Sequence, residues 1–572
     1  MTHKASPIEH VVVLMLENRS FDHLLGRMTH PKVNGIVNAQ GKPNPAYYNE
    51  WVNASGKTIR DTVGSDAPFD VVLKDKRGFG GPSHSFPSAT LQIYANKLPP
   101  SAAALAKPAP MSGFVSSYLN QLKTDVKVAN PTDDEVRLPI TSFKANDLPT
   151  LWQLAGEFCV CDNWFSDLPG PTEPNRLFTH AATSMGLTFN PWGDMPITAR
   201  TVYDELDKAG RDWAFFYFDL SDSDNFPALK KRVDRVLKFD AFLQKAHTGS
   251  LPAYSFLCPR YNDKPPNNCN SQHPPYDVRW GEHFIADVYE ALRGGPLWNK
   301  TLLIVTWDEF GGFYDHVSPP TTGVSNPDGH NAPSPEVQAL ANKKPKYKYA
   351  TTEPEYHFDF QRLGVRVPAL LVSPWIAKGM VDSTRYQHTS IMATLRDLYG
   401  IGTLTKRDAE AKSFSKVLSL SSPRSDAPVK LNRPPILAGP SQADMKSRLT
   451  DPQTEMFSIV AHLDGHPDSG KKLPVPATRE AADAYIAERR AAHEQFHRER
   501  RRHASYEVQQ EANGRYTWQL KSESGEVLAR SATDFASESD AEAVISQIRD
   551  LAPYARQVDA PAPREARRQK KR

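Results

Sequence analysis

The chain is poor in the features that would place it in a specialised class of protein. A formal net charge of +3 is small for 572 residues and gives no case for a nucleic-acid-binding protein as a whole. No apolar run approaches the length of a membrane span. Only 4 cysteines are present. Neither Cys159 with Cys161 nor Cys258 with Cys269 has zinc-site spacing, and the second pair allows either a disulfide or two free thiols.

The N-terminal residues 1–7 have no long apolar segment and no small-residue cleavage site. We therefore expect no secretory signal peptide, so the protein is cytoplasmic, a mature form, or exported by a route that needs no such signal. The length predicts two or more folded units. With 39% hydrophobic and 24% charged residues the composition is that of a globular protein, and 48 prolines indicate long, stiffened loops.

Apolar runs alternate with amphipathic stretches along the first 400 residues, which predicts an α/β fold with a central, mostly parallel sheet sandwiched by helices. Residues 40–145 are expected to form loops and short helices over a core, and residues 198–247 to be mostly helical. The expected strands cover residues 11–16, 159–164, 253–257, 301–307 and 367–372, and the main expected helices cover 151–158, 281–292 and 390–399 and begin near 172.

Composition changes after about residue 420, which predicts further segments. Residues 1–420 form the main domain and 421–477 a Pro- and Ser-rich wrap or linker. Opposite charges at helical spacing favour a solvated helix over 478–503. Residues 504–556 predict a small domain with a three-stranded meander and one helix, and 557–572 a basic disordered tail.

The small domain resembles the bacterial YegP-like domain. The resemblance rests on Trp518-Gln519-Leu520-Lys521, on Gly525-Glu526 and on the helix after Ser537. It covers this segment alone and implies no chemistry.

Two apolar runs end directly in polar residues. Val11–Leu16 leads into Glu17-Asn18, and Leu302–Trp307 leads into Asp308-Glu309. In open α/β sheets the ligand crevice lies outside the carboxyl ends of the strands, so these four side chains are expected to converge. Clustered carboxylates repel one another unless a cation lies between them, which predicts a divalent metal ion, Ca²⁺ or another. The alternative is that both strands simply end at solvent.

Four motifs, in this order, resemble a bacterial phosphoesterase family that holds non-specific phospholipases C and an acid phosphatase group, a branch of the alkaline-phosphatase-like superfamily. The motifs are Glu17-Asn18-Arg19-Ser20-Phe21-Asp22-His23, Pro169-Gly170-Pro171-Thr172-Glu173-Pro174-Asn175-Arg176, Gln272-His273-Pro274-Pro275 and Trp307-Asp308-Glu309-Phe310-Gly311-Gly312-Phe313-Tyr314-Asp315-His316-Val317. The resemblance implies that residues 1–420 are a phosphoesterase catalytic domain with an alkaline-phosphatase-like fold.

The resemblance also implies one divalent metal site and a nucleophile, Thr172. A neutral threonine hydroxyl is a poor nucleophile, and a metal ion would lower its pKa and hold it in line with phosphorus. A helix start at this residue would favour an incoming phosphate. Taken alone, Thr172 is better explained as a helix N-cap, and only its place in the matching motif favours the nucleophile. The implied metal ligands are Glu17, Asn18, Thr172, Asp308 and Glu309.

Three histidines complete the implied catalytic set. His273 is expected to bind phosphoryl oxygens or to protonate the leaving group. His316, brought back toward the metal by Gly311 and Gly312, and His84, in Gly81–Ser85, match histidine positions of the family. For each, a structural or surface role is the alternative.

Other residues of the motifs are expected to bind phosphate or to support the site. Asn175 and Arg176 would touch phosphate or merely pack. Asp315 would orient His316. Asp22 and His23 would cap and position the first helix. A further family position, His388, is interpreted as structural, because a helix starts at Ser390.

The implied activity is a two-step, metal-dependent phosphoryl transfer through a phosphothreonine at Thr172. Thr172 and the Asp308-Glu309 pair of this chain resemble the phospholipase branch of the family. That branch cleaves glycerophospholipids to diacylglycerol and a phosphorylated head group. The chain departs from many secreted members, because no C-terminal β-sandwich repeats follow residue 420. The alternatives are a phosphomonoesterase acting on small substrates and a non-catalytic scaffold. The expected partners are a phospholipid or small phosphoester, with peripheral membrane contact and no nucleic acid.

Overall fold

In a computed structural model the chain forms two compact units, Met1–Glu494 and Gln495–Arg572. The described residues are 6–70, 81–95, 100, 105–191, 193–263, 268–435, 445–446, 449, 451–471, 474–502, 504–522 and 527–551. The tail expected over 557–572 lies outside them, as do Gly525 and Glu526.

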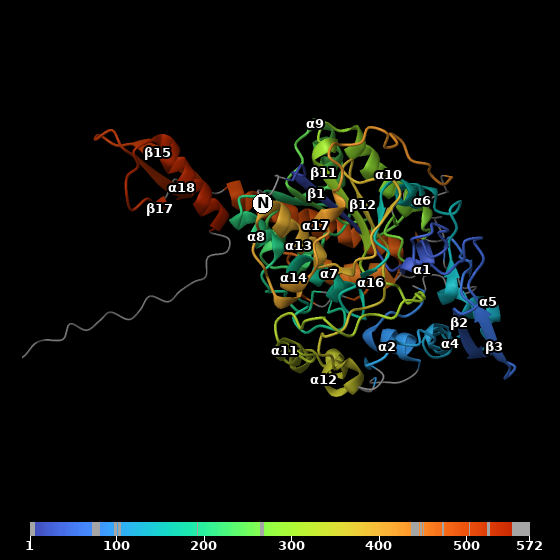
Figure 1. The fold of residues 1–572 in the computed structure, drawn as a ribbon. Helices are drawn as coiled ribbons and strands as arrows, with labels where there is room; N and C mark the ends of the chain where they lie inside the picture. The colour runs from blue at the N-terminus through green and yellow to red at the C-terminus, as the bar shows by residue number, and fades with distance from the viewer. Residues whose placement is uncertain are drawn as a thin grey trace, which may run out of the picture. The chain divides into compact units, whose positions relative to one another are not determined.

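A mixed, mostly parallel sheet of eight strands forms the centre of the first unit (Figure 1). Strand β1 runs parallel to β10 and β11, β8 runs parallel to β10 and β9, and β13 runs parallel to β6. Strand β12 is antiparallel to both β11 and β6. The predicted α/β fold with a mostly parallel sheet is confirmed. In sheet order the strands are β13 (Met380–Val381), β6 (Cys159–Val160), β12 (Ala369–Val372), β11 (Thr301–Trp307), β1 (His10–Leu16), β10 (Tyr254–Leu257), β8 (Trp213–Tyr217) and β9 (Val236–Lys238).

The two strands that end in acidic residues lie side by side at the middle of this sheet. Every residue of β11 is buried, and so is β1 after its first residue, as expected for strands covered on both faces. Their parallel register pairs Leu16 with Trp307, so both strands end at the same level. The polar residues that follow them are therefore neighbours.

Helices and shorter strands surround the sheet. The helices are α1 (Phe21–Leu24), α2 (Phe86–Tyr94), α4 (Phe114–Thr124), α5 (Asp133–Val136), α6 (Pro149–Glu157), α7 (Thr172–Ala181), α8 (Val202–Lys208), α9 (Phe239–Thr248), α10 (Arg279–Gly294), α11 (Pro335–Lys343), α12 (Tyr349–Thr352), α13 (Ser390–Tyr399), α14 (Lys406–Glu410), α16 (Asp451–Val460) and α17 (Arg479–Arg502). The short strand pairs are β2 (Tyr48–Val52) with β3 (Thr58–Thr62), β4 (Ser65–Asp66) with β5 (Thr141–Ser142), and β7 (Trp164–Phe165) with β14 (Tyr386–Gln387).

Four details of the expected secondary structure are wrong. Residues 40–145, expected to form loops and short helices, also contain the strands β2, β3, β4 and β5. Residues 198–247 contain the strands β8 and β9 as well as helices, because the buried aromatic run Trp213–Tyr217 joins the sheet. The strand expected over 159–164 is two short strands that belong to different sheets. The stretch 421–477, expected to be irregular, contains helix α16.

Helix α17 is less solvated than its charge pattern indicated. Arg489, Arg490 and His493 are buried. Arg490 donates to Asp224 at 2.9 Å, and the His493 ring lies 2.9 Å from the carbonyl of Lys230. The cause is the acidic and carbonyl partners that the main unit presents to the helix, which extends that unit to Glu494.

The second unit contains an antiparallel meander, β15 (Ala504–Gln510), β16 (Tyr516–Ser522) and β17 (Val527–Arg530), followed by α18 (Glu538–Leu551). Trp518, Ala541 and Ile545 form its small core. The predicted meander with one helix is confirmed, while the YegP-like resemblance stays a prediction.

Among the described helices, none combines the length and the apolarity needed to cross a bilayer. All four cysteines are buried free thiols, so Cys258 and Cys269 do not form the disulfide that their spacing allowed.

Candidate active site

The polar residues after β1 and β11 are joined to one another by hydrogen bonds. The backbone N–H of Asn18 donates to Oδ1 of Asp308 at 3.1 Å. The N–H of Arg19 donates to the carbonyl of Glu309 at 3.0 Å. Glu17, Asn18, Asp308 and Glu309 are all at most 4% exposed. The structure therefore makes these four buried residues neighbours, and they do not end at solvent, although the carboxylates of Glu17, Asp308 and Glu309 are not one of the close groups among the described residues that could hold an ion.

Asn18 has a φ of +59°, in the left-handed region that non-glycine residues rarely adopt. The loop after β11 fixes this conformation, because a Cβ on Gly311 would lie only 2.1 Å from the carbonyl oxygen of Asn18. A strained residue held in place by its surroundings is typical of a functional site.

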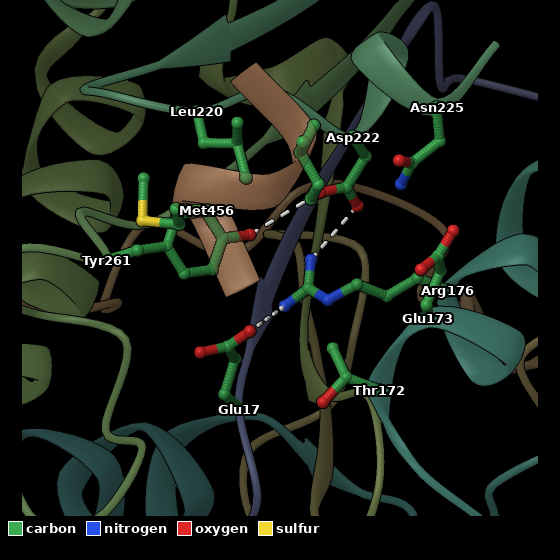
Figure 2. A pocket seen from close by; sticks show the side chains of 10 residues that line it. Glu17, Thr172, Glu173, Arg176, Leu220, Asp222, Asn225, Tyr261 and Met456 are labelled. Carbon is green, nitrogen blue, oxygen red and sulfur yellow. Dashed lines mark hydrogen bonds and ion pairs between the residues drawn. The ribbon is translucent and has the colours of Figure 1, made fainter. Parts of the chain in front are cut away.

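Thr172 is the first residue of α7, and it is not the helix cap. The capping position is Pro171, whose backbone is extended and which makes no side-chain cap hydrogen bond. This geometry removes the capping explanation for Thr172. Its side chain lines a pocket together with Glu17 and Arg176 (Figure 2), and the N-terminal end of the helix favours an anion there.

Asn175 fixes the loop that precedes Thr172. Its Oδ1 accepts from the N–H of Leu168 at 3.1 Å, and its amide nitrogen donates to the carbonyls of Gly170 and Pro171 at 3.0 and 3.1 Å. These contacts occupy both amide N–H groups and leave none for a substrate. The expected phosphate contact of Asn175 is therefore not what its geometry supports, and its contacts are those of a positioning residue.

Arg176 links the acidic groups of the site. Its guanidinium donates to Asp308 at 2.9 Å and to Asp222 at 3.0 Å, and it lies 3.5 Å from Glu17. Figure 2 shows the guanidinium between Glu17 and Asp222. His180 contacts the same oxygen of Asp222 at 3.0 Å. The arginine is thus held on two sides.

Asp222 is a site residue that the sequence reading missed. It begins the 3₁₀ helix Asp222–Asn225, and the pattern Ser221 to Asp224 signals only a capping box. Its contact with Arg176 spans 46 residues, so no local pattern could have revealed it.

The electrostatics of the site favour a bound cation. Burial raises the pKa of Glu17 to about 8, and the nearby Asp308 charge adds to this rise while Arg176 opposes it. Burial also raises the pKa of Asp308. Oε2 of Glu17 and Oδ1 of Asn18 are buried without a hydrogen-bond partner. Buried oxygens without donors and carboxylates that resist ionisation fit a hard divalent ion, whose charge would offset both.

One of the predicted histidines, His84, adjoins the predicted metal ligands, and a second, His273, lies beside it. Nε2 of His84 lies 3.1 Å from the Asn18 amide nitrogen and 3.8 Å from Glu309. The His84 and His273 ring centroids are 6.0 Å apart. Burial lowers the pKa of His84 to about 4 and, with the neighbouring His84, that of His273 to about 3. Both rings are therefore neutral at pH 7.

His388 supports the site from outside, as expected. One ring nitrogen lies 2.7 Å from the carbonyl of Asp308, and the other accepts from the indole N–H of Trp164 at 3.3 Å. These two contacts hold the backbone at the end of β11.

His316 lies in a different cluster. Its ring contacts Asp22 at 2.7 Å and Asn34 at 3.0 Å, neither of which is a predicted metal ligand. Asp22, Asp315 and His316 are close enough to hold an ion, yet Arg366 already pairs with both carboxylates at 2.9 and 3.1 Å. Gly311 of this loop does pack against Asn18, but the His316 ring lies with Asp22 and Asn34, and the catalytic role of His316 stays a prediction.

The roles expected around the first helix are also corrected. Ser20, not Asp22, caps α1 by accepting from the N–H of His23. Asp22, not Asp315, orients His316. The buried Arg366 pairs with both carboxylates, and of the two it is Asp22 that also contacts the His316 ring.

Comparison with known proteins shows the family of the chain. Residues 8–402 match the Phosphoesterase family. "Non-specific phospholipase C6" of Arabidopsis thaliana is 35% identical over 83% of this chain and 86% of its own length. "Non-hemolytic phospholipase C" of Pseudomonas aeruginosa is 28% identical over 69% of this chain and 54% of its own. A solved protein in the alkaline phosphatase superfamily from Vibrio parahaemolyticus matches 47% of this chain and 64% of its own at 14% identity, with a TM-score of 0.26. The chain belongs to the Phosphoesterase family and is a hydrolase of phosphoester bonds.

Proposed function

We propose that the protein is a phosphodiesterase of the phospholipase C type, which cleaves glycerophospholipids to diacylglycerol and a phosphorylated head group. The observation that carries the proposal is that the polar residues after β1 and β11 are neighbours and that one of them, Glu17, lines the same pocket as Thr172. Relatives named non-specific phospholipase C, at 33–35% identity across most of the chain, favour diesters as the substrate.

The residues that would hold the metal are Glu17, Asn18, Thr172, Asp308 and Glu309. The ion is one divalent cation, Ca²⁺ or another, since all of these ligands are oxygens. Bound there, it would lower the pKa of the Thr172 hydroxyl and offset charge on the phosphoryl oxygens. The partnerless Glu17 and Asn18 oxygens are the feature of this chain that supports the assignment.

Thr172 supplies the nucleophile of the proposed reaction. Its Oγ1 forms a bond to phosphorus while the bond from phosphorus to the glycerol oxygen breaks, and that oxygen leaves with a proton as diacylglycerol. A water molecule then attacks the phosphothreonine, which returns the threonine hydroxyl and releases the phosphorylated head group. The α7 N-terminus, beside Thr172, favours the anionic phosphate in both steps.

The neutral histidines would move the protons. The Nδ1 of His273 faces the carbonyl of Pro274 and donates to it, which leaves Nε2 as a proton acceptor. His84 has the same arrangement, with Nδ1 toward the carbonyl of Pro82 at 3.2 Å. Arg176 keeps positive charge beside the phosphate while it holds the carboxylates.

Turnover of p-nitrophenylphosphorylcholine and of p-nitrophenyl phosphate, each with and without a chelator, tests the proposal. We expect chelator-sensitive turnover of the diester, lost in Thr172→Ala. Thr179→Ala is the matched control, because this buried threonine lies on the same helix but does not line the pocket. Peripheral membrane contact is tested afterwards with phospholipid vesicles.

Other outcomes would point elsewhere. Turnover of the monoester alone would move the protein to the phosphatase group of its family. Diester turnover that survives Thr172→Ala would refute the nucleophile. Activity on neither substrate across several metals would leave a scaffold that acts through its C-terminal part.

A further inference from the structure

The pocket at Thr172 has an apolar wall that comes from far along the chain. Met456 and Ile459 of helix α16 line it, together with Leu220. Met456 and Ile459 are 2% and 4% exposed. Figure 2 shows Leu220 and Met456 on one side of the Arg176 guanidinium and Glu17 with Thr172 on the other.

Helix α16 is held firmly in this place. It lies against the short helix Asp222–Asn225, which carries the aspartate bound to Arg176. On its other side Phe457 packs on Tyr485 of α17, with ring centroids 4.6 Å apart. Just after the helix, Lys230 donates to the carbonyl of His462 at 3.2 Å. The wall is therefore a built part of the catalytic unit.

The two sides of the pocket have different chemistry and a different origin. Glu17, Thr172 and Arg176 belong to residues 8–402, which match the family, whereas α16 lies beyond them. The charged side suits the phosphoryl group. The apolar side has no charged group of its own to offer a phosphate, but it can desolvate a hydrocarbon substituent.

We propose that Met456 and Ile459 determine specificity by contacting an apolar substituent esterified to the phosphate. Leu220 completes the surface. The inference rests on the proposed function, since it assigns the phosphoryl group to Thr172 and Glu17. It adds that this chain prefers phosphoesters whose organic group is a hydrocarbon that extends past Arg176. Met456 and Ile459, which would determine this preference, lie outside residues 8–402, the part that matches the family.

Binding of a series of n-alkyl phosphates, from methyl to butyl, tests this independently of turnover. The full chain carrying Thr172→Ala is used so that no ester is cleaved, and affinities are measured by calorimetry in the presence of a divalent metal. Each methylene that reaches the wall should tighten binding about threefold to fourfold. Met456→Ser and Ile459→Ser should flatten this dependence, so that affinity falls more for butyl phosphate than for methyl phosphate.

Two control variants distinguish a lost contact with the alkyl group from a general loosening of helix α16. Met456→Leu keeps an apolar side chain of similar volume and should keep the length dependence. Phe457→Leu loosens the same helix without touching the pocket, and should also keep it. Affinities that do not rise with chain length in the parent protein, or that fall equally for every ester in the serine variants, would overturn the proposal.

Failure of the proposed function would look different. In that case the protein with Thr172 intact would not cleave p-nitrophenylphosphorylcholine, whatever the alkyl series shows. A length dependence that is lost in Met456→Ser would still establish the wall as a hydrocarbon site, and its absence in an active diesterase would refute the wall alone.

Discussion

Replacing Arg176 by methionine tests whether this arginine and the metal ion share the task of offsetting the same carboxylates. The guanidinium lies 2.9 Å from Asp308, 3.0 Å from Asp222 and 3.5 Å from Glu17, and the arginine side chain is 6% exposed. Methionine keeps most of the volume but leaves buried acidic groups without their cation. Removing one partner of a buried ion pair costs about 3–5 kcal/mol.

This cost converts into a measurable change in melting temperature. An entropy of unfolding of about 2.1 cal/mol/K per residue, over a unit of 494 residues, is about 1 kcal/mol/K. In chelator, Arg176→Met should therefore melt about 3–5 °C below the parent protein. A divalent cation stabilises both proteins, so the gap narrows only if the variant, whose carboxylates lack Arg176, binds the ion more tightly; each tenfold lower Kd in the variant would narrow the gap by about 1.4 kcal/mol.

Differential scanning calorimetry with chelator and with Ca²⁺ or Mn²⁺ measures both values. Arg407→Met is the matched control, because Arg407 is a buried arginine paired with Asp167 at 3.2 Å and touches no predicted metal ligand. Its loss of stability should not respond to metal. A gap for Arg176→Met that metal leaves unchanged, as in the control, would refute the reasoning.

Three further predictions follow from single contacts. Asp222→Asn should lower kcat about 10- to 100-fold with little change in KM, because it frees Arg176 without touching substrate; steady-state kinetics measure the split, and a loss confined to KM would contradict it. Gly311→Ala should abolish metal-dependent turnover, because a Cβ there would lie 2.1 Å from the carbonyl of Asn18; undiminished turnover would show that the loop adapts. Glu282→Ala should lower the free energy of unfolding by about 1–3 kcal/mol, because Glu282 accepts from the buried N–H groups that begin α6, whereas Glu282→Gln should cost less; equal losses in urea titrations would exclude this capping role.

The parts of the site that follow strands were predictable from the sequence. Val11–Leu16 and Leu302–Trp307 are continuous apolar runs, and such runs favour central parallel strands. In a parallel sheet the carboxyl ends of neighbouring strands meet at one edge, so the convergence of Glu17 with Asp308 needed only the assumption that the two strands are adjacent. The structure makes them direct neighbours in register.

The parts of the fold that depend on distant packing were not predictable in the same way. Trp213–Tyr217 lies among helical segments, and its pairing with β10 and β9 makes it a strand. The burial of Arg490 depends on Asp224, which is 266 residues away. No periodicity within α17 distinguishes a basic side chain that faces water from one that faces a partner.

The site residues that sequence reasoning missed share one physical cause. Asp222 and Met456 act on the pocket through contacts between elements that the chain order separates widely, and neither has a motif around it. Nucleophile and metal ligands can be read from a sequence because their chemistry requires particular residue types at strand and helix ends. The groups that orient an arginine or form an apolar wall can be of many types, so only the fold identifies them. Within this family's pocket, specificity is therefore expected to vary mainly through such residues, while the polar residues after β1 and β11 stay constrained by the reaction itself.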